Sequence, residues 1–553
     1  MINPRIIVFH YHLLPGGVTS VISTGMEALI EYIPEIVAIT LVTGRDENSE
    51  KIGSKLRNRA GELGREDLKI EIRCLPETDY DNNIPESADI LEKKADHLSA
   101  KLLKEFGGSP WWIHNYHIGK NPILTRALIK TAAATRDQRF YLQIHDFPES
   151  GRLQNLKGLE GVKPLYPTGP NINYFTINAR DRKILIKAGL PSKRVNLMPN
   201  PVKYPHTERI TTLNDKSRIK ERMRAYWGGE FQEFNPDSPL AFYPVRSIRR
   251  KNILEAGALA LLSEQKINLI VSLPGVSKQE NAYSELVHSL FSRGIIPGIW
   301  GTGLGSESIN ENDTENDIPT FDEIASACDV VLSSSLQEGF GYLFVEAAGW
   351  GKPLFSRKLD ILEEITPILE KDRWQTYEKI TVPLFGNMKS RMTRFYKNHI
   401  SQLNGLLPDE LISRIYNDFP KFTAEESENY GVDFSYLPIQ LQAEILEKLK
   451  SDTEFRKECI QMNGSALSNL ESSLKTSDMP LSQKEKTEIE NFFGLESFSR
   501  RFRSIIEEKE TTINRETIMK PKSDTNFGAA VLKAFNSPEY HRPIFQPFTG
   551  ETL

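Results

Sequence analysis

The chain has 553 residues, of which 39% are hydrophobic and 26% are charged, and its formal net charge is -5. This length exceeds what a single hydrophobic core organises, so we expect two or more domains of an ordinary globular kind. The small negative charge excludes a general attraction to nucleic acid or to an anionic membrane, although it leaves room for local basic patches.

The cysteines are three isolated thiols, at Cys74, Cys328 and Cys459. Their odd number and their spacing match neither a disulfide framework nor a metal site, which favours a reducing cytoplasm. The first apolar run is short and has no basic leader, and no stretch approaches the ~18 apolar residues of a spanning helix. We therefore expect a cytoplasmic protein with neither a signal peptide nor a transmembrane segment.

Residues 1–202 alternate short apolar runs with helical patterns. A helix with one apolar side is expected at 18–32, and strands are expected at 5–10, 36–42, 111–113, 140–144, 174–177 and 195–198. Strands separated by helices form parallel, doubly wound sheets, so the pattern predicts a Rossmann-like domain over residues 1–202.

A break at Asn200-Pro201-Val202 and a polar stretch up to Pro239 mark the link to a second domain. A second series follows, with strands expected at 240–245, 267–273, 296–300, 330–333 and 353–356, and helices at 252–262, 321–328 and 343–350. Two such series, with neither a Walker lysine motif nor a G-x-G-x-x-G fingerprint, predict an α/β enzyme with two Rossmann-like domains facing a cleft. We assign residues 203–510 to the second domain and expect the tail, 511–553, to pack on the first.

Residues 358–433 interrupt the second series with charged sequence of helical character. Four basic residues lie close together there, at Lys389, Arg391, Arg394 and Lys397. We expect a solvated helical insertion. The alternative is a surface that grips an anionic acceptor.

The strongest functional signal lies in residues 333–353, where a strand leads through a glycine-containing loop into a helix that begins near Leu343. Glycines let the backbone approach a ligand, and the free N–H groups at a helix start suit a phosphate. Glu338 lies in the loop and Glu346 on the second turn of the helix, where carboxylates accept hydrogen bonds from sugar or ribose hydroxyls. The alternative is a generic strand–loop–helix with two surface glutamates.

This segment resembles the retaining glycosyltransferases of family four, whose signature is the same pair of glutamates and whose fold is called GT-B. Arg246 at a strand end and Lys251 at the next helix start are similar to the two cations with which that family holds the donor diphosphate. Such cations neutralise the leaving nucleoside diphosphate without a metal ion. The resemblance implies that Glu338 holds the sugar and Glu346 the ribose. The implied donor site also includes Gly339, Phe340, Gly341, Tyr342 and Leu343.

The resemblance extends to the first domain. Gly16 and Gly17 are similar to the family's glycine-rich loop after the first strand, which faces the donor across the cleft. His145 resembles the histidine that a strand of the family delivers to the donor sugar, and a histidine satisfied locally at a strand end is the alternative.

Four further residues, at the ends of two expected strands of the first domain, are candidate acceptor contacts. They are Asn115, His117, Lys120 and Asp146. The alternative is that they are ordinary loop residues.

These features predict a retaining hexosyltransferase with an acceptor domain at 1–202 and a donor-binding domain at 203–510. It would use a nucleotide diphosphate sugar as co-substrate and a hydroxyl-bearing acceptor, with no other cofactor, no metal and no nucleic-acid partner. We expect Glu338, His145, Arg246 and Lys251 to serve catalysis without a covalent intermediate, the leaving diphosphate acting as base. Two rivals stay open: another GT-B enzyme, such as a nucleotide-sugar epimerase or a sugar phosphorylase, and a non-catalytic sugar-nucleotide-binding protein.

Overall fold

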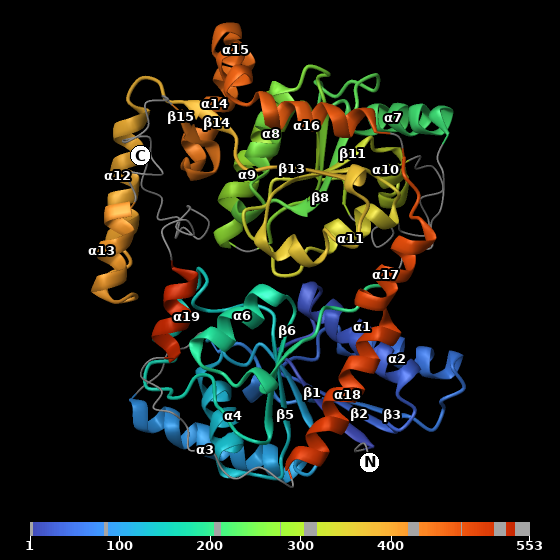
Figure 1. Ribbon diagram of the computed structural model, residues 1–553, viewed down its shortest axis with the longest axis vertical. Helices are drawn as coiled ribbons and strands as arrows, with labels where there is room; N and C mark the ends of the chain where they lie inside the picture. The colour runs from blue at the N-terminus through green and yellow to red at the C-terminus, as the bar shows by residue number, and fades with distance from the viewer. Residues whose placement is uncertain are drawn as a thin grey trace. The chain divides into compact units, whose positions relative to one another are not determined.

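The computed structural model describes residues 4–81, 87–203, 212–276, 278–303, 318–418, 431–476, 478–513 and 527–536. The chain forms two compact units (Figure 1). Of the described residues, those within 4–203, 405–407 and 487–536 belong to unit 1, and those within 212–404 and 408–486 belong to unit 2.

Unit 1 is built on a seven-stranded parallel sheet in the order β3-β2-β1-β4-β5-β6-β7. Its strands are β1 (Arg5–Phe9), β2 (Ala38–Thr43), β3 (Lys69–Cys74), β4 (Trp111–His114), β5 (Phe140–Ile144), β6 (Ile172–Thr176) and β7 (Val195–Leu197). In the register of the sheet, Val8 pairs with Leu41 of β2 on one side and with Trp112 of β4 on the other. Every residue of β4, β5 and β6 is buried, which explains why these strands read as continuous apolar runs.

Helices cover both faces of this sheet. They are α1 (Gly17–Tyr32), α2 (Ser49–Glu62), α3 (Ala88–Phe106), α4 (Pro122–Ala134), α5 (Leu153–Lys157), α6 (Ala179–Ala188), α18 (Leu495–Ile513) and α19 (Phe527–Phe535). The apolar residues of α3, α4, α6 and α19 share one core with the sheet, and those of α1, α2 and α18 share the core on the other face. Unit 1 is therefore doubly wound, as expected.

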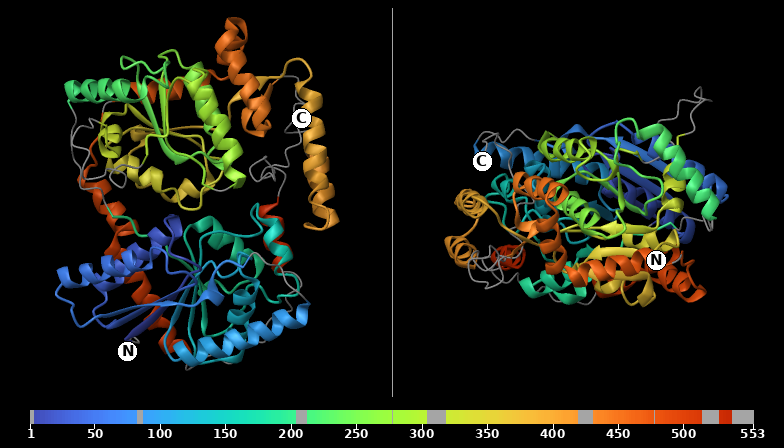
Figure 2. Two further views of the ribbon diagram at one scale, coloured as in Figure 1. Left: turned by 180° about the vertical axis from the view of Figure 1, so that it is seen from behind. Right: turned by 90° about the horizontal axis from the view of Figure 1, so that it is seen from above.

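The C-terminal helices complete unit 1. The helix α18 lies along α1, and α19 lies beside α6 (Figures 1 and 2). Phe498 and Phe502 of α18 pack on Trp112 of β4, with ring centroids 6.0 and 5.2 Å apart. The structure thus places residues 487–510 in unit 1, whereas the sequence pattern assigns them to the second domain. Their apolar side chains are buried by a core formed from the distant N-terminal part of the chain.

Unit 2 contains a six-stranded parallel sheet in the order β10-β9-β8-β11-β12-β13. Its strands are β8 (Leu240–Arg246), β9 (Asn268–Leu273), β10 (Gly298–Trp300), β11 (Val330–Ser333), β12 (Leu354–Arg357) and β13 (Trp374–Tyr377). The helices of this part are α7 (Leu213–Trp227), α8 (Ile253–Leu262), α9 (Lys278–Ser292), α10 (Phe321–Ala327) and α11 (Tyr342–Gly349). This strand order is the Rossmann order. The expected α/β class, with two Rossmann-like doubly wound domains, is confirmed.

The remaining elements of unit 2 follow the sheet. They are β14 (Thr381–Pro383), α12 (Met388–Ser401), α13 (Asp409–Asp418), β15 (Gly431–Asp433), α14 (Ile439–Ser451), α15 (Thr453–Met462) and α16 (Gly464–Lys475). The helix α17 (Gln483–Phe493) spans the boundary between the two units. Within the described ranges, no helix combines the length and the apolarity needed to cross a bilayer.

The insertion expected at 358–433 begins too early, because β13 lies inside that range and pairs with β12, Ser356 opposite Thr376. This strand is short and half polar, so it lacks the apolar run by which a buried strand is recognised. The helical excursion of α12 and α13 lies between β14 and β15, which pair with each other in antiparallel orientation.

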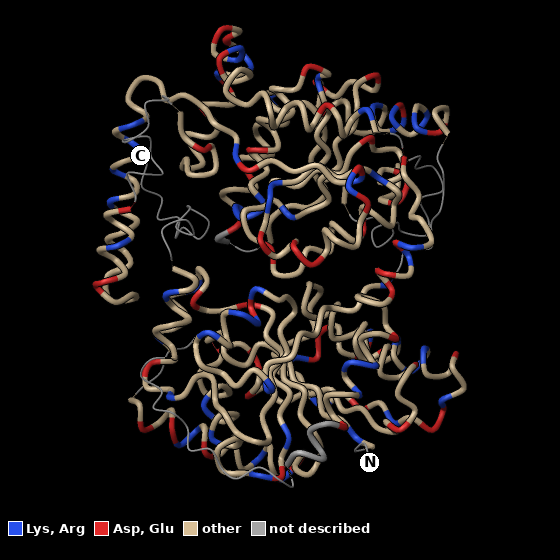
Figure 3. The backbone as a smooth tube through the Cα atoms, viewed as in Figure 1, with Lys and Arg blue, Asp and Glu red and all other residues tan. Residues whose placement is uncertain are grey.

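The basic residues of the excursion line α12, as Figure 3 shows. Arg391 forms a bidentate pair with Glu444 of α14, at 2.7 and 2.8 Å. Lys389, Arg394 and Lys397 are exposed, opposite a buried stripe that includes Met392. An exposed charged face backed by an apolar stripe is the pattern of a solvated surface helix.

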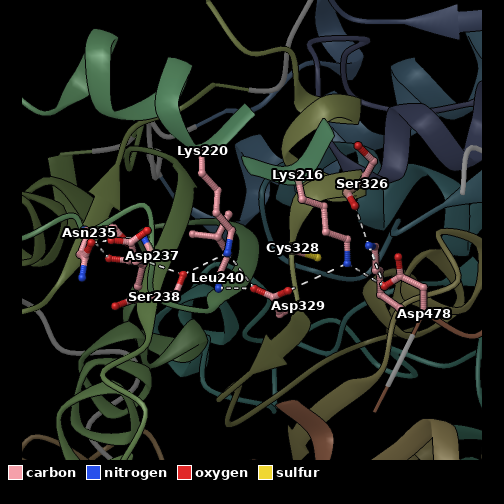
Figure 4. Close-up of polar contacts among 12 residues, drawn as sticks. Lys216, Lys220, Asn235, Asp237, Ser238, Leu240, Ser326, Cys328, Asp329 and Asp478 are labelled. Carbon is pink, nitrogen blue, oxygen red and sulfur yellow. Dashed lines mark hydrogen bonds and ion pairs between the residues drawn. The ribbon is translucent and has the colours of Figure 1, made fainter. Parts of the chain in front are cut away.

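A network of charges ties α7 to the amino-terminal end of the unit 2 sheet (Figure 4). Lys220 Nζ lies 3.2 Å from Asp329 Oδ2, directly before β11. Lys216 Nζ lies 3.2 Å from Asp478 Oδ1, and the buried Lys352 lies 3.0 Å from the same oxygen. The segment that enters unit 2 and the segment that leaves it are thereby bonded to each other.

Candidate functional site

The predicted donor residues of unit 2 gather at one place in its sheet. The strands β8 and β11 are neighbours, but the chain continues from β8 to β9 on one side and from β11 to β12 on the other. Outside the carboxyl ends of such strands lies the crevice in which open α/β sheets bind their ligands. Arg246 ends β8, and Lys251 and Glu338 lie in the loops that follow β8 and β11.

Glu338 and Lys251 form a direct ion pair across this crevice, between Lys251 Nζ and Glu338 Oε1. Arg250 Nη1 lies 3.4 Å from the other carboxylate oxygen, and the Ser335 hydroxyl donates to Oε1 at 2.5 Å. Burial by itself raises the pKa of Glu338, but the two cations and the hydrogen bonds lower the pKa overall. Burial lowers the pKa of Lys251, and Glu338 partly offsets this effect.

The two loops are joined by further hydrogen bonds beneath the ion pair. The Ser334 hydroxyl lies 3.2 Å from the carbonyl of Lys251 and 3.0 Å from that of Asn252. The Tyr243 hydroxyl lies 2.8 Å from the carbonyl of Lys251 and 2.9 Å from Ser335 Oγ. Hydrogen bonds from the loop after β11 therefore help to fix the position of Lys251, which itself lies in the loop after β8.

Arg250, Ser335 and Tyr243 were not among the residues predicted for the site. The run of three basic residues at 249–251 and the run of three serines at 333–335 were the signals for the first two. Tyr243 gave no signal, because a tyrosine inside a strand reads as core.

Arg246 differs from Arg250 and Lys251, which both contact Glu338. Its side chain is half-buried, and it makes no hydrogen bond or ion pair with any residue that the structure describes. A guanidinium offers five N–H donors in a planar fork that fits a phosphate. Arg246 is therefore available to an anionic ligand at the carboxyl end of β8.

Glu346 lies on the second turn of α11, as expected, and its half-buried carboxylate has no hydrogen-bonding partner among the described residues. Burial raises its pKa, and Lys251 works in the opposite direction. Gly341 precedes the helix with φ 88°, a conformation in which a side chain would be strained. The first turn, which begins with Tyr342 and Leu343, has neither a side-chain cap nor an acidic residue, so its N–H groups suit an anion. Of the other loop residues, Gly339 leads to Phe340, whose ring lies 4.7 Å from that of Tyr342.

The predicted residues of unit 1 also gather at a switch point, where β1 and β4 are neighbours. Five histidines lie at this edge of the sheet, either at the end of a strand or in the loop that follows it: His10, His12, His114, His117 and His145. Burial lowers the pKa of His10 and His117 to about 3 and that of His145 to about 4. Near neutral pH these rings are uncharged, so they offer a hydrogen-bond donor and an acceptor rather than a cation.

His145 is held in place by two neighbours. His145 Nε2 lies 2.9 Å from His114 Nδ1. The backbone N–H of His145 donates at 2.9 Å to Asn115 Oδ1, which also accepts from the N–H of Asp146 at 3.3 Å. Asn115 has φ 55° and is buried, so its carboxamide shapes the loop after β5.

The other acceptor candidates share this edge. His117 is buried, Lys120 is half-buried, and Asp146 Oδ2 lies 3.3 Å from Arg152 Nη1. Gly16 and Gly17 are exposed at the start of α1, whose first turn has no side-chain cap and no acidic residue. Each unit thus collects its predicted residues at the carboxyl edge of its own sheet. The cleft that would join the two sets stays a prediction.

Across the described part of the chain, no group of three or more His, Cys, Asp or Glu side chains is arranged to hold a metal ion. Three basic residues, Arg246, Arg250 and Lys251, belong to the unit 2 site.

Comparison with known proteins identifies a relative of this chain by sequence. No family model matches the chain. Over 446 residues it is 28% identical to the mannosylglucosyl-3-phosphoglycerate synthase of Petrotoga mobilis, and the match covers 79% of each protein.

Among solved structures, it is similar to Anabaena HepE in complex with UDP and glucose, with a TM-score of 0.47, 12% identity and coverage of 92% of this chain and 100% of the other. It is also similar to the sucrose-phosphate synthase of Thermosynechococcus elongatus, with a TM-score of 0.47, 11% identity and the same coverage.

Proposed function

We propose that this protein is a glycosyltransferase that moves a hexose from a nucleotide diphosphate sugar to a hydroxyl group of an acceptor, with retention at the anomeric carbon. The observation that carries the proposal is the arrangement at the unit 2 switch point. There the Lys251–Glu338 pair lies between the two loops, and Arg246 and Glu346 have no side-chain partner among the described residues. Similarity to the Petrotoga synthase over 79% of both chains supports the same class of reaction.

In this proposal Arg246 and Lys251 bind the diphosphate. Lys251 has three N–H donors, so it can keep its bond to Glu338 and still donate to a phosphate oxygen. As the bond between the anomeric carbon and the diphosphate breaks, negative charge builds on the leaving nucleoside diphosphate. Fixed cations in a partly desolvated site stabilise that charge, which is the transition-state effect that catalysis requires.

The two glutamates would then have different tasks. Glu346 has both carboxylate oxygens available for the ribose hydroxyls. Glu338 already accepts from Lys251, Arg250 and Ser335, and a carboxylate has about four acceptor sites. Glu338 therefore positions the cations and keeps about one site for a hydroxyl of the transferred sugar.

For the chemical step we propose no covalent intermediate and no metal. The acceptor oxygen bonds to the anomeric carbon, the bond to the diphosphate breaks, and the acceptor proton passes to the leaving diphosphate. His145, neutral because it is buried, would hydrogen-bond to a hydroxyl of the sugar from unit 1. Gly16 and Gly17 would contribute backbone N–H groups at the start of α1.

The acceptor is proposed from the relative. That protein is named as a synthase of mannosylglucosyl-3-phosphoglycerate. We propose that this chain likewise adds mannose to the glucose hydroxyl of glucosyl-3-phosphoglycerate.

The test incubates the full chain with GDP-, UDP- and ADP-sugars, with and without glucosyl-3-phosphoglycerate, and measures nucleoside diphosphate and disaccharide product. Acceptor-dependent release of nucleoside diphosphate is expected. Conversion of the sugar without an acceptor would favour an epimerase, and a requirement for free phosphate a phosphorylase. A donor that raises the melting temperature but is never turned over would favour a binding protein.

A further inference from the structure

Lys120 is an unusual lysine of unit 1. It lies in the loop after β4, at the carboxyl edge of the sheet, and its side chain is half-buried. Its ammonium makes no ion pair with a carboxylate that the structure describes. The ammonium lies over the ring of Tyr80, whose centroid is 5.6 Å from Nζ.

The charged groups around Lys120 do not balance its positive charge. Burial lowers the pKa of Lys120, and the second cause is Arg152, a charge of the same sign. The carboxylates around Tyr80 have other partners: Asp146 lies 3.3 Å from Arg152, and Asp79 lies 2.5 Å from Arg45. His12 packs its ring edge against Tyr80 at 4.7 Å, and burial lowers its pKa, so it adds no balancing charge.

A half-buried cation beside a second cation is unfavourable unless an anion completes the group. A contact with the face of a tyrosine ring is a weak substitute for a counter-ion. The protein thus holds in unit 1 a positive charge for which the described part of the chain has no negative partner. On the same edge, His117 and His145 are neutral and suit hydroxyl groups rather than charges.

We propose that Lys120, with Arg152 beside it, binds an anionic oxygen group of the acceptor, a phosphate or a carboxylate, and so selects charged over neutral acceptors. The inference rests on the proposed function and deepens it. The two cations would hold the acid end of the acceptor, while the neutral His117 faces its sugar hydroxyls.

The experiment compares Lys120→Met, which removes the charge, with Lys120→Arg, which keeps it. Lys130→Met is the matched control, because Lys130 lies on the surface of α4 in ion pairs with Glu92 and Asp96. The acceptors are glucosyl-3-phosphoglycerate and its uncharged analogue glucosylglycerol. Lys120→Met should raise KM for the charged acceptor about 10- to 100-fold, the size expected for a lost charge-assisted hydrogen bond. Lys120→Arg should restore most of this loss, and Lys130→Met should behave as wild type.

Calorimetric binding of 3-phosphoglycerate, inorganic phosphate and glycerate to the full chain gives an answer that does not depend on turnover. Weaker binding by Lys120→Met of the phosphate-bearing ligands supports a phosphate site, and weaker binding of glycerate supports a carboxylate site. If Lys120→Met binds all three as wild type does, or loses charged and neutral acceptors by the same factor, the proposal is overturned. If no acceptor releases nucleoside diphosphate but Lys120 is still needed to bind 3-phosphoglycerate, the proposed function fails and the anion site stands. Melting curves exclude loss of fold as the cause.

Discussion

Replacing Glu338 with alanine separates the contribution of this carboxylate to the fold from the role in donor binding that we propose for it. The change removes the acceptor of the Lys251 ion pair, of the Arg250 contact at 3.4 Å and of the Ser335 hydrogen bond at 2.5 Å. Two cations then remain close together in the site without a counter-charge.

The cost to stability follows from these contacts. Removing one partner of a buried ion pair costs ~3–5 kcal/mol, and a hydrogen bond to a charged group contributes ~1.5–3 kcal/mol. The side chains of Lys251 and Glu338 keep 15% and 12% exposure, so water relieves part of the penalty. We expect the free energy of unfolding of unit 2 to fall by about 2–4 kcal/mol, measured by denaturant titration of the full chain.

The effect on the donor site has the opposite sign. Without Glu338, the charge of Lys251 is uncompensated and attracts the diphosphate more strongly, so affinity for the bare nucleoside diphosphate should be unchanged or higher. Turnover should fall, because Lys251 and Arg250 lose the group that positions them. Calorimetry with the nucleoside diphosphate and a product assay measure the two effects separately.

Glu346→Ala and Glu363→Ala are the comparison variants. Glu346 has no side-chain partner in the described structure, so its removal should leave stability nearly unchanged and lower nucleoside diphosphate affinity, with Glu346→Gln intermediate. Glu363 is exposed and should have no effect on either quantity. If Glu338→Ala and Glu346→Ala weaken nucleoside diphosphate binding equally, the division of tasks between the two glutamates is refuted.

Four further predictions concern other parts of the molecule. Arg246→Ala should cost about 2–4 kcal/mol of transition-state stabilisation with no change in melting temperature, and near wild-type turnover at saturating donor would contradict the diphosphate clamp. Transfer should persist in EDTA, and activity lost in EDTA and restored by magnesium or manganese would count against protein cations as the charge carriers. Burial raises the pKa of Glu149 from 4.5 to about 7. The protonated carboxyl therefore stabilises the fold fully below pH 4.5, and this stabilisation, at most about 3 kcal/mol, is lost as the pH rises to about 7. Glu149→Gln should flatten the dependence of melting temperature on pH in this window, and an unaltered slope would refute the assignment. Asp478→Ala should lower the free energy of unfolding by about 1–3 kcal/mol, because the buried Lys352 loses its carboxylate partner, and a neutral result would show that water replaces that partner.

Much of the fold is visible in the local pattern of the chain. The strand β5 lies at Phe140–Ile144, where its apolar run predicts it, and α11 begins within one residue of the expected position. Such elements are recognised because each carries its own signal: a continuous apolar run for a buried parallel strand, and a glycine before a helix. The candidate donor residues were recognised for the same reason, since Glu338 and Glu346 lie in one strand–loop–helix segment.

Only the tertiary structure shows which segments that are distant in sequence lie in contact. Strand order brings the β8 and β11 loops together, and only then do Lys251 and Glu338, 87 positions apart, form a pair that occupies most of the carboxylate. The same holds for His114 and His145 on neighbouring strands, and for α18, whose apolar side is buried by unit 1 rather than by the unit that precedes it. The sequence pattern does not predict β13, because its half-polar residues adopt a strand through backbone pairing with β12 and not through an apolar run of their own. Local propensity and periodicity are properties of a short segment, whereas burial and charge pairing depend on which other segment is adjacent, and that is set by the packing of the whole unit.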